Sequence, residues 1–466
     1  MVASKVINNK QYHVGSNSDA VIATAPASLY HEQTHSFTPP SFTPSTGVIV
    51  RSDVHHSTST RGLMSDLDLV FDVNNGSATD TMHVHHFSAL FQFLKVYVDN
   101  IEVYDSQDTD VSLLSLTRNL LITSKDYNEY KERWMASGVV SGDGGFLSGY
   151  NASQNVNLAP STGGRITIPM NLILGGVMDK FDTAVCNKIT VEIRFRPNSG
   201  VVAETGKFIS NATANTNIYP SLTVTNAHIE QRVQLYSDEK LLKDPSTPHV
   251  FPLIKHEKQT FTLSKSIATA TTASPATLRV RLSDSFSYRK RIVGVQMALA
   301  PQYTVFNSVA TGQSWQPLIT KATITKNGKE LVNLQDYHKF ARQAQEFIRS
   351  LGSDFVLTCE GVKDAAKLEQ EEVLFHGNCG NYVSFLNPHL QENRGDWQSD
   401  LRFIQGISNS QNDSWELELS IAESPVVAAG APLVDFGDSI DLHLLYVELL
   451  SVKKCPRTGT EVKVFS

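Results

Sequence analysis

The chain of 466 residues contains few cysteines, few charges and no long apolar run. Its four cysteines are widely spaced and form no Cys-x-x-Cys pair, which is typical of a protein made in a reducing compartment. No apolar segment reaches the roughly 18 residues that span a bilayer. Met1 leads into polar sequence that has no signal-peptide pattern. We therefore expect neither a disulfide framework, nor a membrane-spanning helix, nor a secretion signal.

Basic residues are also fewer than acidic ones. Lysine and arginine total 40 against 47 aspartates and glutamates, which gives a formal net charge of −7. There is no Lys/Arg-rich run and no basic tail, whereas proteins that bind nucleic acid directly concentrate positive charge on a patch or an arm. The composition therefore argues against direct, sequence-specific binding of nucleic acid. Hydrophobic residues make up 41% of the chain, which is enough for proper cores.

The sequence lacks the motifs of the common enzyme classes. It contains no Gly-x-Ser-x-Gly, no His-Glu-x-x-His and no P-loop. The glycine-rich segment 142–145 is not framed by a strand and a helix, so it is interpreted as a flexible loop and not a phosphate site. The carboxylate pair Glu371-Glu372 lies in a charged run and is interpreted as solvated. We therefore predict no catalytic residue.

Histidines supply the best candidates for metal ligands. His83 and His85 would share one face of a strand, with His86 beside them, and facing imidazoles suit zinc or iron. The glycines and carboxylate spacing of a cupin site are missing, so we favour surface histidines. The pair at 55–56 and the segment 376–379, which holds one thiol, are weaker candidates. The sequence therefore predicts no metal site and no cofactor.

A hairpin with a strong strand pattern lies at 91–104. Leu94, Val96 and Val98 alternate with polar residues, which is the period of a half-buried strand. The pair Asp99-Asn100 suits a tight turn, and a second strand follows. Beyond a polar loop, the apolar spacing at 113–135 predicts a helix.

The same order of elements recurs further along the chain. The segment 319–332 again reads as a strand, a turn on Asn327-Gly328 and a second strand, and a helical pattern follows at 337–348. Matching Asn100 to Asn327 gives an offset of 327 − 100 = 227 residues. A match at one place means little in a β-rich chain, whereas a duplication repeats at several places.

Three further pairs of segments correspond, in the same order along the chain. Alignment of Val191 with Leu417 gives 417 − 191 = 226, close to the first offset. We therefore predict an internal duplication. The corresponding pairs are 165–172 with 381–388, 188–195 with 415–421, and 222–229 with 439–446.

The predicted fold class is all-β, with two consecutive eight-stranded jelly-roll β-sandwiches and short helices in the long connections. Polar, Ser/Thr/Pro-rich sequence before residue 47 predicts an extended arm. Three prolines mark a linker, and a polar tail is expected at the end. The predicted units are the arm at 1–46, the first jelly roll at 47–237, the linker at 238–252, the second jelly roll at 253–452 and the tail at 453–466.

The chain resembles the double jelly-roll major capsid proteins of icosahedral viruses. The resemblance covers about 48–452 and rests on the repeated hairpin, on the strands within 165–196, and on the segments 397–403 and 415–419. It implies a structural protein of the virion, made in a host cell, whose homotrimers form pseudo-hexameric capsomers. It also implies penton and minor capsid proteins as partners and a possible internal membrane, and it supplies no catalytic residues. The acidic composition suggests that another layer separates this wall from the genome.

Two other functions remain open from the residues alone. One is a two-domain carbohydrate-binding or surface protein made of β-sandwiches, which exposed tryptophan or tyrosine platforms would support. The other is a β-sandwich hydrolase, which the missing motifs disfavour. The state of assembly discriminates between them, because a capsid protein forms a stable trimer.

Overall fold

The structure is a computed structural model of the whole chain. The residues that it describes are 3–7, 10–14, 29–56, 61–80, 82–84, 87–106, 156–170, 181–198, 209–211, 219–235, 244–266, 270–271, 273–282, 291–299, 318–336, 382–384, 407–408, 414–422, 439–455 and 459–465.

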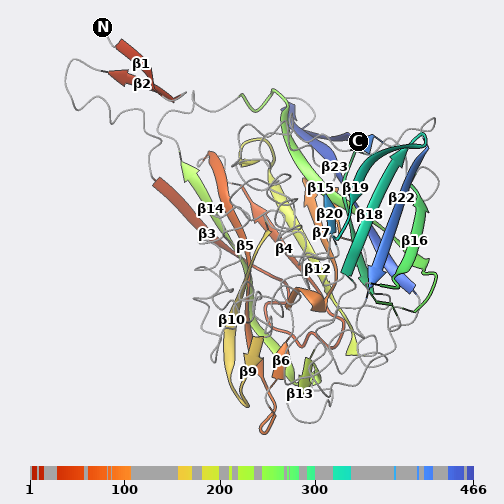
Figure 1. Cartoon of the computed structure of the whole chain (residues 1–466). Helices are drawn as coiled ribbons and strands as arrows, with labels where there is room; N and C mark the ends of the chain where they lie inside the picture. The colour runs from red at the N-terminus through yellow and green to blue at the C-terminus, as the bar shows by residue number, and fades with distance from the viewer. Residues whose placement is uncertain are drawn as a thin grey trace.

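Eight strands of the first half form two facing sheets (Figure 1). One sheet has the order β10-β5-β14-β3 and the other the order β4-β12-β7-β8, with antiparallel neighbours. Successive strands alternate between the two sheets, except for the hairpin β7–β8 within one sheet, and this is the jelly-roll arrangement. The strands are β3 (Leu29–Ser36), β4 (Ile49–His55), β5 (Gly62–Asn75), β7 (Phe91–Val98), β8 (Ile101–Asp105), β10 (Gly163–Pro169), β12 (Lys188–Phe195) and β14 (Leu222–Leu235).

Smaller elements accompany this first sandwich. A two-stranded hairpin and a three-stranded sheet in the order β13-β6-β9 stand outside the two main sheets, and β11 pairs with β5. Their bounds are β1 (Ala3–Ile7), β2 (Lys10–Val14), β6 (Met82–Val84), β9 (Val156–Leu158), β11 (Phe181–Asp182) and β13 (Ile209–Asn211), with 3-10 helices η2 (Phe87–Leu90) and η3 (Tyr219–Ser221).

The second half repeats the arrangement. Its sheets have the orders β15-β23-β17-β20 and β16-β22-β18-β19, while β21 pairs with β17 and β24 pairs with β23. The strands are β15 (His249–Thr262), β16 (Ala276–Arg281), β17 (Arg291–Leu299), β18 (Leu318–Lys326), β19 (Lys329–Leu334), β20 (Tyr382–Ser384), β21 (Ile407–Ser408), β22 (Trp415–Ala422), β23 (Ser439–Cys455) and β24 (Gly459–Phe465).

The two sandwiches have one topology. Taken in chain order, β3, β4, β5, β7, β8, β10, β12 and β14 correspond to β15, β16, β17, β18, β19, β20, β22 and β23. Exchanging each strand for its counterpart converts the sheets of the first half into those of the second. All four sequence correspondences fall on counterpart strands. The all-β duplicated jelly roll predicted from the sequence is therefore confirmed. Both predicted helical runs, at 113–135 and 337–348, lie outside the described residues.

The hairpins β7–β8 and β18–β19 show how closely the halves correspond. Their turn residues all have positive φ, as a type I′ turn requires: Asp99 (45°), Asn100 (71°), Asn327 (51°) and Gly328 (76°). Both hairpins carry a register shift, after Val96 and after Ile324, an offset of 324 − 96 = 228. The sequence match of Asn100 to Asn327 was therefore wrong by one place, because Asp99 is the counterpart of Asn327.

The first turn residue has the same role in each half. Asp99 Oδ1 accepts the backbone N–H of Lys188 at 2.9 Å, and Asn327 Oδ1 accepts that of Ser414 at 2.8 Å. Each turn residue also donates its own N–H to the carbonyl of the same partner, at 3.1 and 2.8 Å. These bonds tie the β7–β8 and β18–β19 turns to the starts of β12 and β22.

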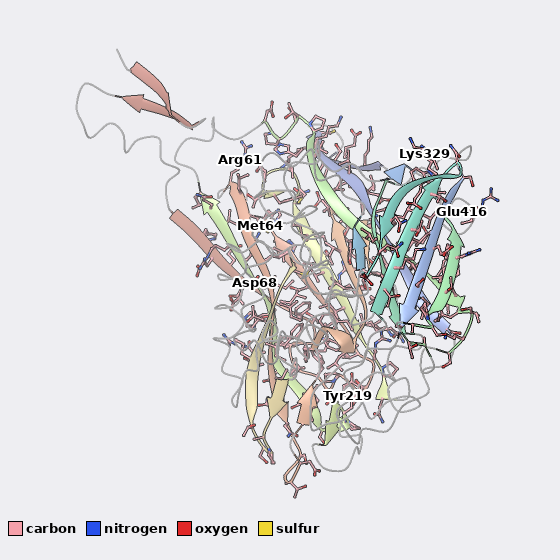
Figure 2. All side chains as sticks on the ribbon, in the orientation of Figure 1. Arg61, Met64, Asp68, Tyr219, Lys329 and Glu416 are labelled. Atoms are coloured by element: carbon pink, nitrogen blue, oxygen red, sulfur yellow. The ribbon has the colours of Figure 1, made fainter. Side chains whose placement is uncertain are left out.

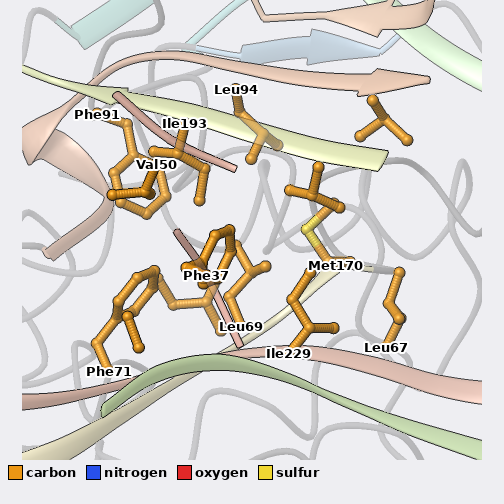
Figure 3. Packing of buried hydrophobic residues seen from close by; sticks show 14 of the residues in the cluster. Phe37, Val50, Leu67, Leu69, Phe71, Phe91, Leu94, Met170, Ile193 and Ile229 are labelled. Atoms are coloured by element: carbon orange, nitrogen blue, oxygen red, sulfur yellow. The ribbon is translucent and has the colours of Figure 1, made fainter. Parts of the chain in front are cut away.

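The core of the first sandwich lies between its two sheets (Figure 3). Leu67, Leu69, Phe71 and Val73 alternate along β5 and are all buried there, as their spacing predicts. The ring of Phe71 lies 5.0 to 6.1 Å from four other phenylalanine rings, the partners being Phe37, Phe87, Phe91 and Phe195. Such aromatic contacts add stability beyond the buried area alone.

The predicted arm at 1–46 is wrong for its second part. Strand β3 pairs along its whole length with β14 and belongs to the first sandwich. Phe37, which follows β3, is 1% exposed and donates its N–H to Ala227 O at 2.9 Å. The sequence signal was masked because β3 is rich in His, Glu and Gln, with few of the residues that favour strands.

We predict that Phe37→Ala destabilises the protein by about 3 to 5 kcal/mol, because it removes a buried ring and leaves a cavity in the first core. Urea unfolding followed by tryptophan fluorescence and circular dichroism measures this change. The matched control is Phe93→Ala on β7, where the ring is half-buried, and we expect a loss of about 1 kcal/mol there. Equal losses would mean that residue 37 lies outside the core.

Candidate functional site: the junction between the two sandwiches

One strand, β23, contributes to both hydrophobic cores. Its pairing with β15 runs from Ser439 to Val452 without a register shift, so alternate residues stay on one face. On that face Ile440, Leu442 and Leu444 belong to the second core, whereas Leu450 and Val452 belong to the first. Figure 1 shows β15 and β23 between the first sandwich and strands β18 and β22.

Strand β24 extends this contact. The sequence predicted a polar tail at 453–466, but β24 pairs with β23 from Leu449 to Cys455, and Val462 packs against the first core. The tail prediction is therefore wrong for residues 453–455 and 459–465. The alternation of Val462 and Val464 with charged neighbours is a strand pattern. The charged residues of this segment favoured the interpretation as a polar tail instead. We call the end of β23 (446–455), β24 and the surface that they contact the junction.

Hydrogen bonds fix the junction as well as apolar packing. The hydroxyl of Thr460 on β24 donates to the Asp99 carboxylate and lies 3.4 Å from Val185 O. The N–H of Lys454 donates to Pro245 O at 2.8 Å. Asp99, the turn residue that holds the start of β12, thus also binds the second half of the chain.

The predicted linker at 238–252 overlaps this region. His249 to Pro252 already belong to β15, where they pair with Leu449 to Val452 of β23. The end of the predicted linker is therefore sheet. The described part before it, at 244–248, is a turn held by the Asp244 carbonyl and carboxylate.

Polar groups on the shared face lie between the two cores. Glu448 forms an ion pair with Lys255 of β15 at 2.6 Å, with side chains only 13% and 22% exposed. Tyr446 is 6% exposed and lies near Tyr104 of β8, whose pKa is raised by burial. Charge pairs of this kind fix geometry more than they add stability, because removal from water offsets the attraction.

A half-buried histidine and a buried cysteine lie on the first-sandwich side of the junction. His56 Nδ1 is 3.4 Å from both the carbonyl and the Sγ of Cys186, and its ring is 6.3 Å from that of Phe181. Burial lowers the pKa of His56 to about 4 and raises the pKa of the Cys186 thiol. Both groups are therefore neutral near pH 7, and a thiol of raised pKa is a poor nucleophile.

The other histidine candidates give no metal site among the described residues. His83 lies on β6, opposite Ser210 of β13 and Asn157 of β9. The remaining members of that cluster, His85 and His86, are outside the described residues. No group of three potential ligands comes together in the part of the chain that the structure describes. The segments 142–145, 371–372 and 376–379 are not described.

The outer faces of the sheets carry charges that pair within each sheet. Lys95 lies 3.2 Å from Glu102 and 3.0 Å from Asp105 on the first sandwich, and Arg279 lies 2.8 Å from Glu418 on the second. Figure 2 shows Lys329 on the edge strand β19 and Glu416 on β22 of the second sandwich. A hollow of about 370 Å³ on the first sandwich is lined in part by Glu32, Asp68, Glu230 and Arg232. The outer faces of these sheets therefore carry charges of both signs.

Comparison with known proteins finds similarity in structure but not in sequence. No family model and no curated protein matches the sequence. A chain of the PBCV-1 virus capsid superposes with a TM-score of 0.54 and 11% identity, over 93% of this chain and 96% of that one. The Sputnik virophage structure gives 0.52 and 12%, over 95% and 89%.

The chain has a double jelly-roll fold. Each superposition includes both sandwiches, since it covers more than nine-tenths of the chain. At identities of 11% and 12%, the superpositions show a shared fold and no more. A shared fold does not imply a shared function, so the function has to be derived from the residues of this chain. No helix among the described residues is long and apolar enough to cross a membrane.

We predict that Val462→Asp uncouples the two jelly rolls. A carboxylate at this partly buried site of the first core costs about 3 kcal/mol or more unless the strand detaches. Differential scanning calorimetry should then show two transitions where the wild type shows one. Val464→Asp is the matched control two residues away, where the side chain is 40% exposed. If the two variants melt alike, the docking of β24 is refuted.

We also predict that acid weakens the junction through His56. Its pKa is about 4 in the folded chain and about 6.5 when unfolded, so between these values the unfolded chain binds the extra proton. The contribution of neutral His56 to stability is therefore fully present above pH 6.5. The free energy of unfolding falls by up to about 3 kcal/mol as the pH drops to 4. Urea titrations across this range should show a shallower pH dependence for His56→Gln. Exposed His55→Gln should leave the slope unchanged; an unchanged slope in both would count against the assignment.

Proposed function

We propose that this protein is the major capsid protein of an icosahedral virus, with a structural and not a catalytic role. Its homotrimers form pseudo-hexameric capsomers in the shell of the virion. The observation that carries this proposal is the shared strand β23, which joins two jelly rolls of one topology into a single unit. Three such units present six similar walls, so a three-fold object can tile a near-hexagonal lattice.

The composition supports a wall that does not touch the genome. The formal charge is −7, and the described sheet faces pair their charges internally. We therefore propose that a further layer, an internal membrane or separate proteins, lies between this shell and the nucleic acid. Penton and minor capsid proteins are the expected partners at the vertices and between the capsomers.

The described tryptophan gives the carbohydrate-binding alternative no support. Such a site needs an aromatic platform that faces solvent. Trp415 is 4% exposed, and the ammonium group of Lys326 lies 4.7 Å above its ring. The other three tryptophans lie outside the described residues.

Light scattering coupled to gel filtration tests the proposal. We expect a trimer of 3 × 51.4, or about 154 kDa, and negative-stain images with a hexagonal outline. A monomer that binds a glycan column would favour the alternative. Trimers that bind DNA or RNA tightly at moderate salt would refute the intervening layer and leave the capsid role intact.

A further inference from the structure

The loop between β11 and β12, residues 183–187, is held from two sides. On one side, the backbone N–H of His56 donates to Asn187 O at 2.9 Å. On the other side, the hydroxyl of Thr460 on β24 lies 3.4 Å from Val185 O. A histidine of the first jelly roll and the last strand of the chain therefore contact the same short loop.

The carboxylate of Asp99 connects the two sides. It accepts the backbone N–H groups of Asn187 and Lys188, each at 2.9 Å, and it accepts the hydroxyl of Thr460. Its negative charge also acts on His56, where it favours a protonated ring. A proton on His56 would therefore compete with Thr460 for this carboxylate.

The docked arrangement does not accommodate a proton on His56. The Nε2 atom of this ring is buried and has no hydrogen-bond partner among the described residues. A protonated imidazole has two N–H donors, and a buried donor that lacks an acceptor costs free energy. Neutral His56 therefore fits the docked structure, whereas the imidazolium requires water or a carboxylate at Nε2.

Charged and titratable groups face this site from several elements. The burial of His56 outweighs the attraction to Asp99 and lowers its pKa to about 4, and His35 of β3 adds a further unfavourable charge. The thiol of Cys186, beside the ring, is neutral near pH 7 because burial raises its pKa. The charges that act on this thiol are those of Asp99, Lys454 of β23 and Asp182 of β11.

Strand β24 is held to the first jelly roll by few contacts. It pairs with β23 along one edge, Val462 packs against the first core only in part, and Val464 is 40% exposed. Edge elements with few buried contacts open locally at a low free energy. The bond from Thr460 to Asp99 is therefore important for keeping the strand in place.

We propose that β24 is an acid-sensitive latch on the first jelly roll, because a proton on His56 and a docked β24 exclude each other. On protonation the loop 183–187 moves and the Asp99 carboxylate turns toward the imidazolium, which leaves Thr460 without its acceptor. The strand then detaches, while the β15–β23 ladder and both cores stay folded. This inference goes beyond the proposed function and does not depend on it.

The pH range of the latch follows from the two states of His56. Its pKa is about 4 with β24 docked and about 6.5 when the ring is exposed, so the open form binds the proton more tightly. Opening is therefore least favourable above pH 6.5 and becomes more favourable as the pH falls toward 4. Between pH 7 and pH 5 the equilibrium constant for opening rises by up to about 20-fold.

Hydrogen–deuterium exchange of the full chain, read by mass spectrometry, tests the latch. Uptake is measured at pH 7 and pH 5 and corrected for the pH dependence of the chemical exchange rate. We expect the protection of peptides from 459–465 to fall by up to about 20-fold. Peptides from 329–334, the edge strand β19 of the second sandwich, should keep theirs. Unchanged protection of β24, or an equal loss in β19, overturns the proposal.

Substitutions on both sides of the loop separate the latch from a general effect of acid. His56→Gln should abolish the pH dependence of β24, whereas His55→Gln, at the exposed neighbour, should retain it. The coupling is reciprocal, so Thr460→Val should lower the protection of β24 about fivefold at pH 7. Thr460→Ser keeps the hydroxyl and should stay within about twofold of wild type. If His56→Gln does not fold, equal protection in the two Thr460 variants still refutes the latch.

Discussion

The architecture depends on a single strand whose two ends lie in different hydrophobic cores. Period-2 alternation along β23 places Leu442 in one core and Val452 in the other, with the Glu448–Lys255 ion pair between them. A flexible linker would leave two sandwiches free to reorient, whereas a continuous strand resists bending because its hydrogen-bond ladder with β15 has no break. Rigidity between the halves is therefore a property of secondary structure and does not require a large interface.

The sequence predicted strands well wherever one face of a strand is exposed to solvent and the other is buried. Such strands include β7, most of β12 and the first half of β22, and their alternation predicted both the strands and the duplication. It was less informative where polar residues are used in packed elements. Strand β3 reads as polar sequence, but its backbone completes a sheet and leads directly to the buried Phe37. Strand β24 was not recognised because Glu461 and Lys463 interrupt its apolar residues.

The junction could not be predicted because its partners are far apart in sequence. The bond from Thr460 to Asp99 joins residues separated by 361 positions, and no local pattern encodes such a pair. What the sequence did contain was the turn itself. Asp99-Asn100 and Asn327-Gly328 both suit positive φ, and the different first residues reflect different tasks. In the first half, the Asp99 carboxylate accepts four donors, two of them backbone N–H groups. In the second half, the Asn327 side chain accepts the backbone N–H of Ser414, just before β22.

The sharing of a core also has a consequence for synthesis on the ribosome. Phe37 and Val462 pack in the same cluster, although 462 − 37 = 425 residues separate them. At typical elongation rates of about 5 to 20 residues per second, the first sandwich waits roughly 20 to 85 s for the strand that completes it. During this interval its β8 edge stays uncovered. A chain that stops short of β24 therefore leaves an incomplete first core, so that only nearly full translation products reach the completely folded form.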